Sequence, residues 1–285
     1  MNAIADIVYI DSIVVKASQE GFSVEDFIDM VSTDTTFYSA FCNLRTLTHT
    51  FDTEMAFFDR KVRESGSYEA THHQNVIGNC RSMQAINEQW EGKMMKKRKD
   101  AFRFYTATMY QRLFLYEGQI CDEEVPISVA GPGASSNHVT ELKRLVFSPG
   151  APSNVPLIGK KTAIFSDRMR SYYDFSIRSD TYRNEIDVYV FSVGLKPEFE
   201  GKKDNSTVIK SVTTYFAKDD FQVLARSYQL SNYTLLYDFD VNMHIELSIV
   251  GGKYVPENIK YKGFWKIPFK KMEKGSFTLQ FYDFN

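Results

Sequence analysis

The chain has 285 residues, of which 43% are hydrophobic and 25% charged, a balance typical of proteins that bury a sizeable core. Its net charge of −2 gives no electrostatic reason to expect nucleic acid or an acidic membrane as a partner. No stretch of about 18 apolar residues is present, so the sequence predicts no transmembrane helix. Residues 1–10 lack the basic and long apolar segments of a signal peptide, so we expect none in this sequence.

The chain has three cysteines, Cys42, Cys80 and Cys121, which lie far apart in the sequence. They form no CxxC pair, which excludes a zinc ribbon and a thioredoxin-type motif. One disulfide among them is an open alternative. We expect three buried free thiols instead, because free cysteine behaves as a small hydrophobic residue.

The N-terminal half combines strands with two helical segments. Alternating apolar residues predict a strand over 7–15, and Ser23 with Asp26 has the spacing of a capping box. Apolar residues at helical spacing then predict two short helices, or one kinked helix, over 23–44. From residue 45 the pattern indicates strands, and we expect strand also over the aromatic segment 101–116.

Loops and short helices follow, and then strands to the end of the chain. Residues 128–136 form a Gly- and Ser-rich loop, a helix is expected over 137–147, and another short helix begins at Ser166. After residue 174 short connections predict an antiparallel meander. We therefore expect one domain, 1–285, divided into 1–44, 45–127, a helix-and-loop plug at 128–173, and the C-terminal meander at 174–285.

The run 233–249 has an apolar side chain at every odd position. This period of two predicts one strand with a single buried face, about 55 Å long at roughly 3.3 Å per residue. A turn at Gly251-Gly252-Lys253 should pair it with strand 254–267. Because apolar positions must face apolar positions, a three-residue loop would place Asp238 opposite Lys266 and His244 opposite Lys260.

The apolar positions of these strands and of 276–284 predict a broad hydrophobic face. A second sheet, a bilayer, or helices with a ligand could cover it; the short, irregular earlier strands and the helical segments argue against the bilayer. The helices are few and short for so large a face. An aromatic-lined groove for an acyl chain is thus one hypothesis, and a packed core is the other. The candidate groove residues are Tyr237, Phe239, Val241, Met243, Ile245, Tyr261, Trp265, Phe277 and Leu279.

The polar residues form no recognisable catalytic or metal motif. Asp238, Asp240, Asn242, His244 and Glu246 alternate along the strand, and side chains at i and i+2 lie roughly 7 Å apart, too far for neighbours alone to chelate a metal. We expect a solvated face that pairs with lysines opposite. Adjacent His72 and His73 should point to opposite faces of a strand, so they cannot chelate together. No catalytic residue, metal or cofactor is predicted.

The pattern as a whole resembles the lipoprotein-carrier family (LolA/LolB-like half-barrels) of Gram-negative envelopes. The resemblance rests on the helical N-terminal segment, the mid-chain plug and the alternating C-terminal half. Within that half, residues 213–221 (Thr-Thr-Tyr-Phe-Ala-Lys-Asp-Asp-Phe) with 223–226 (Val-Leu-Ala-Arg) resemble the family's strand-turn-strand hairpin. Residues 236–243 resemble a segment of envelope proteins of the same group. The chain is longer than the small carriers and has no lipidation cysteine at its start.

The resemblance implies an α+β fold, a strongly curved antiparallel β-sheet forming an open half-barrel, with a few short helices on its concave face. It implies a non-enzymatic protein of the cell envelope, periplasmic or outer-membrane-associated. Such a protein binds lipid or the acyl chains of a lipoprotein and contacts membranes peripherally. Two alternatives stay open: a structural or interaction module with a packed core and no ligand, and a hydrolase that uses the polar face 238–246.

Overall fold

The computed structural model describes residues 7–10, 13–16, 23–97, 101–121, 150, 159–200, 206–234, 238–266 and 272–285. These residues belong to two compact units, one formed by Met1–Tyr38 and Ser128–Thr234, the other by Ser39–Ile127 and Leu235–Asn285. We call them unit 1 and unit 2. The single domain expected from the sequence stays a prediction. No helix in the described part of the chain is long and apolar enough to span a membrane.

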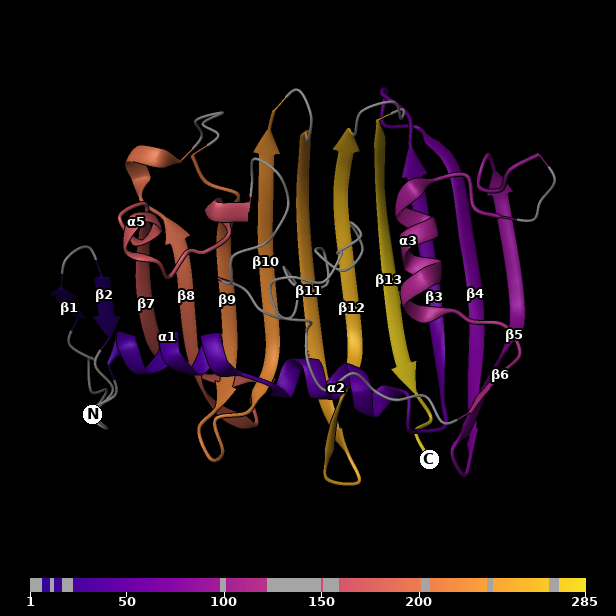
Figure 1. The fold of residues 1–285 in the computed structure, drawn as a ribbon, viewed down its shortest axis with the longest axis horizontal. Helices are drawn as coiled ribbons and strands as arrows, with labels where there is room; N and C mark the ends of the chain where they lie inside the picture. Colours follow the sequence, from indigo (N-terminus) through magenta and orange to yellow (C-terminus); the bar gives the residue numbers. More distant parts are fainter. Residues whose placement is uncertain are drawn as a thin grey trace. The chain divides into compact units, whose positions relative to one another are not determined.

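Unit 1 is built on an open sheet (Figure 1). All of its neighbouring strands are antiparallel except β2 and β7, which run parallel. The strand order is β1 (Ile7–Ile10), β2 (Ile13–Lys16), β7 (Tyr173–Tyr182), β8 (Ile186–Leu195), β9 (Ile209–Ala217) and β10 (Val223–Tyr233). The strand expected over 7–15 is therefore two strands, since β1 ends at Ile10 and β2 begins at Ile13.

The helix α1 (Val24–Thr33) begins with the capping box expected from the sequence. The Ser23 side chain accepts the backbone N–H of Asp26, while the Asp26 carboxylate accepts the backbone N–H of Ser23 at 2.7 Å. This reciprocal pair satisfies two donors that the first turn of a helix leaves without intrahelical partners. The buried Phe27 ring then packs on the sheet, 5.4 Å from the Tyr189 ring and 5.6 Å from that of Phe216.

The helix α2 (Thr36–Leu44) follows, so the prediction of two helices over 23–44 is confirmed. A buried ion pair within unit 1 fixes the chain just before α2: the Arg226 guanidinium lies 3.1 Å from the Asp34 carboxylate. The guanidinium also donates to Thr214 and lies over the Phe37 ring. A short helix, α5 (Asp167–Arg170), begins after Ser166 as predicted, while the helix expected over 137–147 lies outside the described residues.

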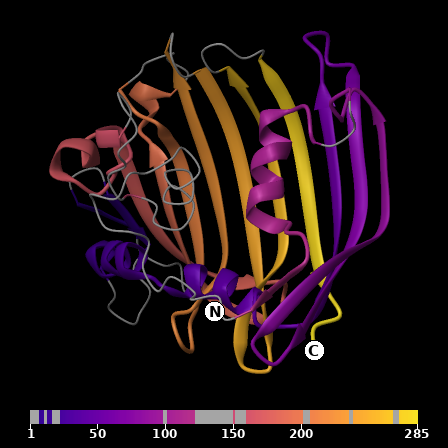
Figure 2. The same cartoon turned by 45° about the vertical axis from the view of Figure 1, so that its right-hand side comes forward.

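Unit 2 is a fully antiparallel open sheet that curves around one helix, α3 (Tyr105–Phe114) (Figure 2). Its order is β11 (Asp238–Val250), β12 (Lys253–Lys266), β13 (Glu273–Tyr282), β3 (His49–Phe58), β4 (Glu64–Ile77), β5 (Cys80–Gly92) and β6 (Gln119–Cys121). The last strand of the chain thus pairs with the first strand of this unit, Phe281 facing Phe51. The predicted α+β class, with open antiparallel sheet and few short helices, is confirmed.

Two predictions about these elements are wrong. The segment 101–116 is mainly helix, because Thr106, Ala107 and Tyr110 bury one face at helical spacing, a period that the many aromatic residues obscured. The run 233–249 is not one strand, since β10 ends at Tyr233 and β11 begins at Asp238. The alternation of apolar residues over 233–249 thus continues from the end of β10 into β11, although these are separate strands.

The β11–β12 hairpin has the predicted register but reaches it differently. Asp238 faces Lys266 and His244 faces Lys260, as expected. The turn, however, has two residues, Gly251 and Gly252, with φ of 56° and 77°. A β-bulge after Glu246 inserts one extra residue into β12 and restores the parity that a three-residue loop would have given.

Candidate apolar ligand-binding face

The residues predicted to line a groove share one face of the unit 2 sheet, which we call the apolar face. Adjacent strands place Met243, Tyr261 and Phe277 in one row and Ile245, Ile259 and Leu279 in the next. The first row continues through Met55 and Tyr68 on β3 and β4. The apolar face comprises Phe239, Val241, Met243, Ile245, Ile259, Tyr261, Trp265, Phe277, Leu279, Phe281, Phe51, Met55, Phe57, Tyr68 and Ala70. Tyr237 and Ile267 lie outside the described residues.

Burial differs along this face. Phe239, Ile245 and Leu279 are 2%, 1% and 0% exposed, so their side chains already have protein neighbours. Met243 and Trp265 are only half-buried. On β11 and β12, the parts of the apolar face that are open to a further apolar contact are therefore those at Met243 and Trp265.

The aromatic rings of this region are stacked and their polar atoms are paired. The Trp265 ring lies 4.7 Å from the Phe239 ring, and the Tyr261 ring lies 4.7 Å from that of Phe277. Trp265 Nε1 donates to Tyr261 Oη at 2.5 Å. Burial raises the pKa of Tyr261, so its hydroxyl stays protonated and neutral. The two polar groups satisfy each other and leave an apolar surface around them.

The helix α3 covers the neighbouring part of the apolar face. The Tyr110 ring lies 6.0 Å from the Phe277 ring, and the Phe114 ring lies 6.4 Å from that of Phe281. The Tyr110 hydroxyl also shares a hydrogen bond of 2.7 Å with Thr53 on β3. Figures 1 and 2 both show α3 lying along β13 and β3. Its contact with the sheet is thus mostly aromatic.

The start of α3 is capped by a residue of β13. Phe104 occupies the N-cap position and offers no side-chain acceptor. The Glu273 carboxylate replaces it and accepts the backbone N–H groups of Tyr105 at 2.5 Å and Thr106 at 3.0 Å. A carboxylate at a helix N-terminus also interacts favourably with the helix dipole. The sequence contained no signal for this cap, because Glu273 and Thr106 are 167 positions apart in the chain.

Glycines surround Phe57 in one row of the sheet, and one of them, Gly275, makes room for the Phe57 ring. Gly263, Gly275, Phe57, Gly66 and Gly92 face one another across five strands. A Cβ at Gly275 would lie 2.7 Å from the Phe57 ring, which stacks on Phe104 at 4.0 Å. Gly275 therefore leaves room for this stacked aromatic pair. A single sequence does not reveal such a row, since its members are distant in the chain.

The opposite face of β11 and β12 carries the predicted polar row. His244 Nε2 lies 3.5 Å from Glu246 Oε1, and His244 faces Lys260 across the strands. Asn242 faces Lys262 in the same way. These pairings match the expected polar face, and no group of three or more potential metal ligands occurs in the described part of the chain.

Three histidines, His49, His72 and His73, lie on the strands β3 and β4. The rings of His49 and His72 are buried, and burial lowers the pKa of each to about 4, so both are neutral near pH 7. His49 Nδ1 lies 2.9 Å from the Leu47 carbonyl oxygen, and His72 stacks on Phe51 at 4.9 Å. His73 instead pairs with Thr50 at 3.1 Å. The predicted divergence of His72 and His73 is consistent with these different partners.

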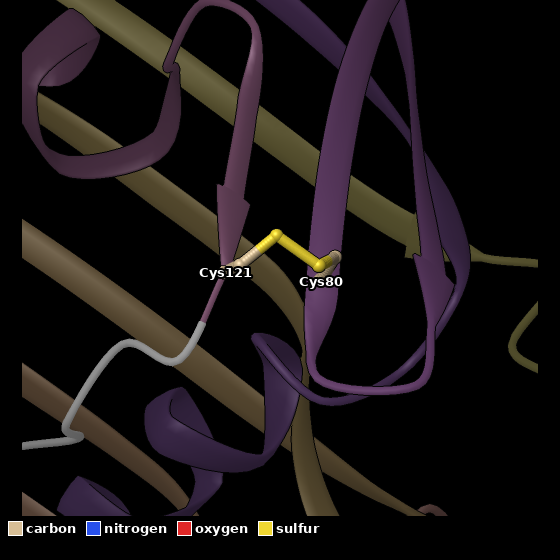
Figure 3. Close-up of a disulfide and its surroundings, with 2 residues drawn as sticks. All are labelled: Cys80 and Cys121. Atoms are coloured by element: carbon tan, nitrogen blue, oxygen red, sulfur yellow. A yellow bond between two sulfur atoms is a disulfide. The ribbon is translucent and has the colours of Figure 1, made fainter.

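The expectation of three free thiols is wrong. Cys80 on β5 and Cys121 on β6 form a disulfide (Figure 3), and only Cys42 is a free thiol. Because β5 and β6 are adjacent and antiparallel, the two cysteines face each other directly. The prediction failed because β6 has three residues, too short for its pairing to show in the sequence. The bridge fixes the chain segment that carries α3 to the edge of the sheet.

No protein-family model matches the chain, and no curated protein matches it. Among solved structures it is similar to a DUF1329 family protein from Desulfovibrio piger, at 9% identity over 92% of each chain and a TM-score of 0.28. It is also similar to a LolA superfamily protein from Nitrosomonas europaea, at 10% identity over 93% of this chain and 94% of that one, TM-score 0.27. A putative outer membrane lipoprotein-sorting protein domain from Vibrio parahaemolyticus matches at 10% identity over 92% and 90%, TM-score 0.28. Scores this low support no conclusion about function.

Proposed function

We propose that the chain is a non-enzymatic protein of the cell envelope that binds a lipid, or the acyl chain of a lipidated protein, on the apolar face of unit 2. The observation that carries this proposal is the row Met243–Tyr261–Phe277 with the neighbouring Phe239–Trp265 pair. The Glu273 carboxylate, which lies on this face opposite Trp265, is engaged with α3. An apolar surface of this kind suits a hydrocarbon chain.

The binding energy would come from burial. Each methylene of an acyl chain that leaves water contributes about 0.8 kcal/mol, less the cost of ordering the chain. Met243 and Trp265, the half-buried members of the apolar face on β11 and β12, have apolar surface left to bury. We therefore place the entry of the acyl chain at Trp265 and its path past Tyr261 toward Met243.

The disulfide supports the proposed location. Structural disulfides persist in oxidising compartments such as the bacterial periplasm and are rare in the cytosol. The Cys80–Cys121 bridge is thus in keeping with the envelope location implied by the sequence resemblance.

A second candidate function is that of a structural or interaction module whose apolar face is filled by its own side chains. The near-complete burial of Phe239, Ile245 and Leu279 favours it. The two candidates differ in one measurable property, because only the first predicts that the folded protein takes up free fatty acid. The hydrolase alternative has no observation of this kind in its favour.

The test uses a fluorescent fatty acid and the variant Phe239→Glu. A carboxylate placed against hydrocarbon costs several kcal/mol unless it is protonated or reached by water. We expect the wild-type chain to bind the probe and Phe239→Glu to fold with a lower Tm and lose it. Ile186→Glu is the control, because Ile186 is 40% exposed and lies on β8 of unit 1, away from the apolar face. Wild-type protein that binds no probe, together with an insoluble Phe239→Glu, would establish the packed core instead.

A further inference from the structure

Within the described part of the chain, one edge of β5 has no neighbouring strand along most of its length. On the side away from β4, its described partner is β6, which pairs only with Cys80, Arg81 and Ser82. The nine residues from Gln84 to Gly92 are all exposed to solvent. Alternate residues of an edge strand direct backbone N–H and C=O groups outward, where another extended chain can pair with them.

This edge also exposes large apolar side chains. Ile86 is 58% exposed and Trp90 is 37% exposed. Both are residues that favour contacts between strands. Edges of this kind are usually blunted by lysine or proline in proteins that must avoid strand addition. Gln84–Gly92 contains neither.

A groove of about 370 Å³ opens beside the edge, on the polar face of β13, β3, β4 and β5. Its walls include four glutamates, one of which, Glu91, belongs to the edge strand itself. The other three are Glu54, Glu64 and Glu69.

Two of these glutamates oppose each other directly, since Glu54 faces Glu69 across β3 and β4. Like charges at directly opposite positions of a sheet are destabilising, and a cation placed beside them would relieve that repulsion. The nearest lysine of the same row is Lys260, on the far side of Thr278. The side of the groove toward β5 is therefore acidic.

We propose that the edge Gln84–Gly92 binds an extended peptide segment bearing lysine or arginine, which adds to the sheet as a further strand. Backbone pairing with β5 would supply affinity, as in other cases of strand addition. An added strand lies about 4.8 Å from β5, so a long basic side chain on its polar face reaches over Gln89 to Glu69 and Glu91. The apolar side chains on its other face would lie beside Trp90. Trp90 faces Tyr68 of the apolar face, whereas the proposed contacts of the basic side chains lie on the opposite, polar face and need no acyl ligand.

The test measures binding of the labelled peptide acetyl-Lys-Val-Lys-Val-Lys-Val-Lys-amide to the full chain by fluorescence anisotropy. Two further peptides carry the same side chains with N-methyl groups at one or the other alternate set of residues, which prevents pairing through that set. The protein variants are Glu69→Gln/Glu91→Gln at the groove and, as a control with the same change in charge, Glu185→Gln/Glu200→Gln in unit 1. Circular dichroism checks that each variant is folded.

We expect the unmodified peptide to bind wild-type protein and one N-methylated form to bind at least tenfold more weakly. The groove variant should bind roughly tenfold more weakly, since two partly exposed ion pairs are lost, and the control variant should match the wild type. Absence of binding overturns the proposal. Equal affinity for all three peptides overturns it as well, because charge attraction alone would then explain the binding. Equal affinity of the groove variant and the control would show that the acidic groove has no part in it.

Discussion

The carboxylate of Glu273 on β13 accepts the backbone N–H of Thr106 at 3.0 Å, so the sheet itself caps the helix that covers it. The same carboxylate accepts the N–H of Tyr105. Because Phe104 supplies no cap, this single side chain satisfies two donors at the start of α3. The relationship couples the position of α3 to β13 and hence to the Tyr261–Phe277 part of the apolar face.

The first prediction concerns this cap. Glu273→Ala should lower the free energy of unfolding by about 1–2 kcal/mol, because the first turn of α3 loses its acceptors and its favourable charge. Urea denaturation followed by circular dichroism measures it. Glu54→Gln, which changes a carboxylate on the neighbouring strand and the opposite face, is the control; it should not lower stability and should raise it slightly, because it relieves the repulsion with Glu69. Equal effects of both substitutions would show that the cap does not hold α3.

The second prediction concerns the glycine row. Gly275→Ala should destabilise by about 1–3 kcal/mol, because its Cβ would lie 2.7 Å from the Phe57 ring and that ring is held by Phe104. Gly194→Ala on β8 is the matched control, since a Cβ there meets no atom within 4 Å. A glycine in a strand interior is by itself unfavourable, so the control should be neutral or slightly stabilising. Thermal unfolding of both variants decides the point, and a neutral Gly275→Ala would contradict the close approach.

The third prediction concerns the β11–β12 turn. Gly252 has a φ of 77°, a conformation that β-branched residues adopt at high cost. Gly252→Val should therefore destabilise by about 1 kcal/mol or more, whereas Gly252→Asn should cost less, because asparagine tolerates positive φ. Chemical denaturation of the two variants side by side tests this. Indistinguishable stabilities would argue against the two-residue turn.

The hairpin also shows what the sequence could predict and what it could not. Alternation of apolar residues predicted its faces and the opposition of Asp238 to Lys266, because burial of one face fixes parity. It could not separate a three-residue loop from a two-residue turn followed by a bulge, since both give the same parity. The pairing of β13 with β3, the Glu273 cap and the Cys80–Cys121 bridge join residues distant in the chain, and no local pattern encodes them. For the candidate site, sequence placed the groove residues on one face but did not predict that α3 packs on part of it.

The fourth prediction concerns the disulfide. The double variant Cys80→Ser/Cys121→Ser should be less stable by about 2–4 kcal/mol, because the bridge closes a loop with a sequence separation of 41 residues. Loosening should be local, with amide hydrogen exchange rising in β6 and α3 more than in β11 and β12. Cys42→Ser is the control, since Cys42 is a free thiol. Uniform exchange across unit 2 would contradict the role of the bridge as an anchor of α3.

The last prediction concerns the stability of the protein at acidic pH. His49 and His72 have a pKa of about 4 in the folded protein against 6.5 in the unfolded chain, because burial disfavours the charged imidazole. The unfolded chain thus binds protons that the folded protein does not, so stability is fully present above pH 6.5 and is lost as pH falls from 6.5 to 4, by up to about 3 kcal/mol for each histidine. The free energy of unfolding measured at intervals over this range should fall steadily in the wild type. His49→Gln/His72→Phe should flatten this dependence, because neither new side chain titrates. A wild-type slope that survives the double substitution would assign the acid sensitivity to other groups.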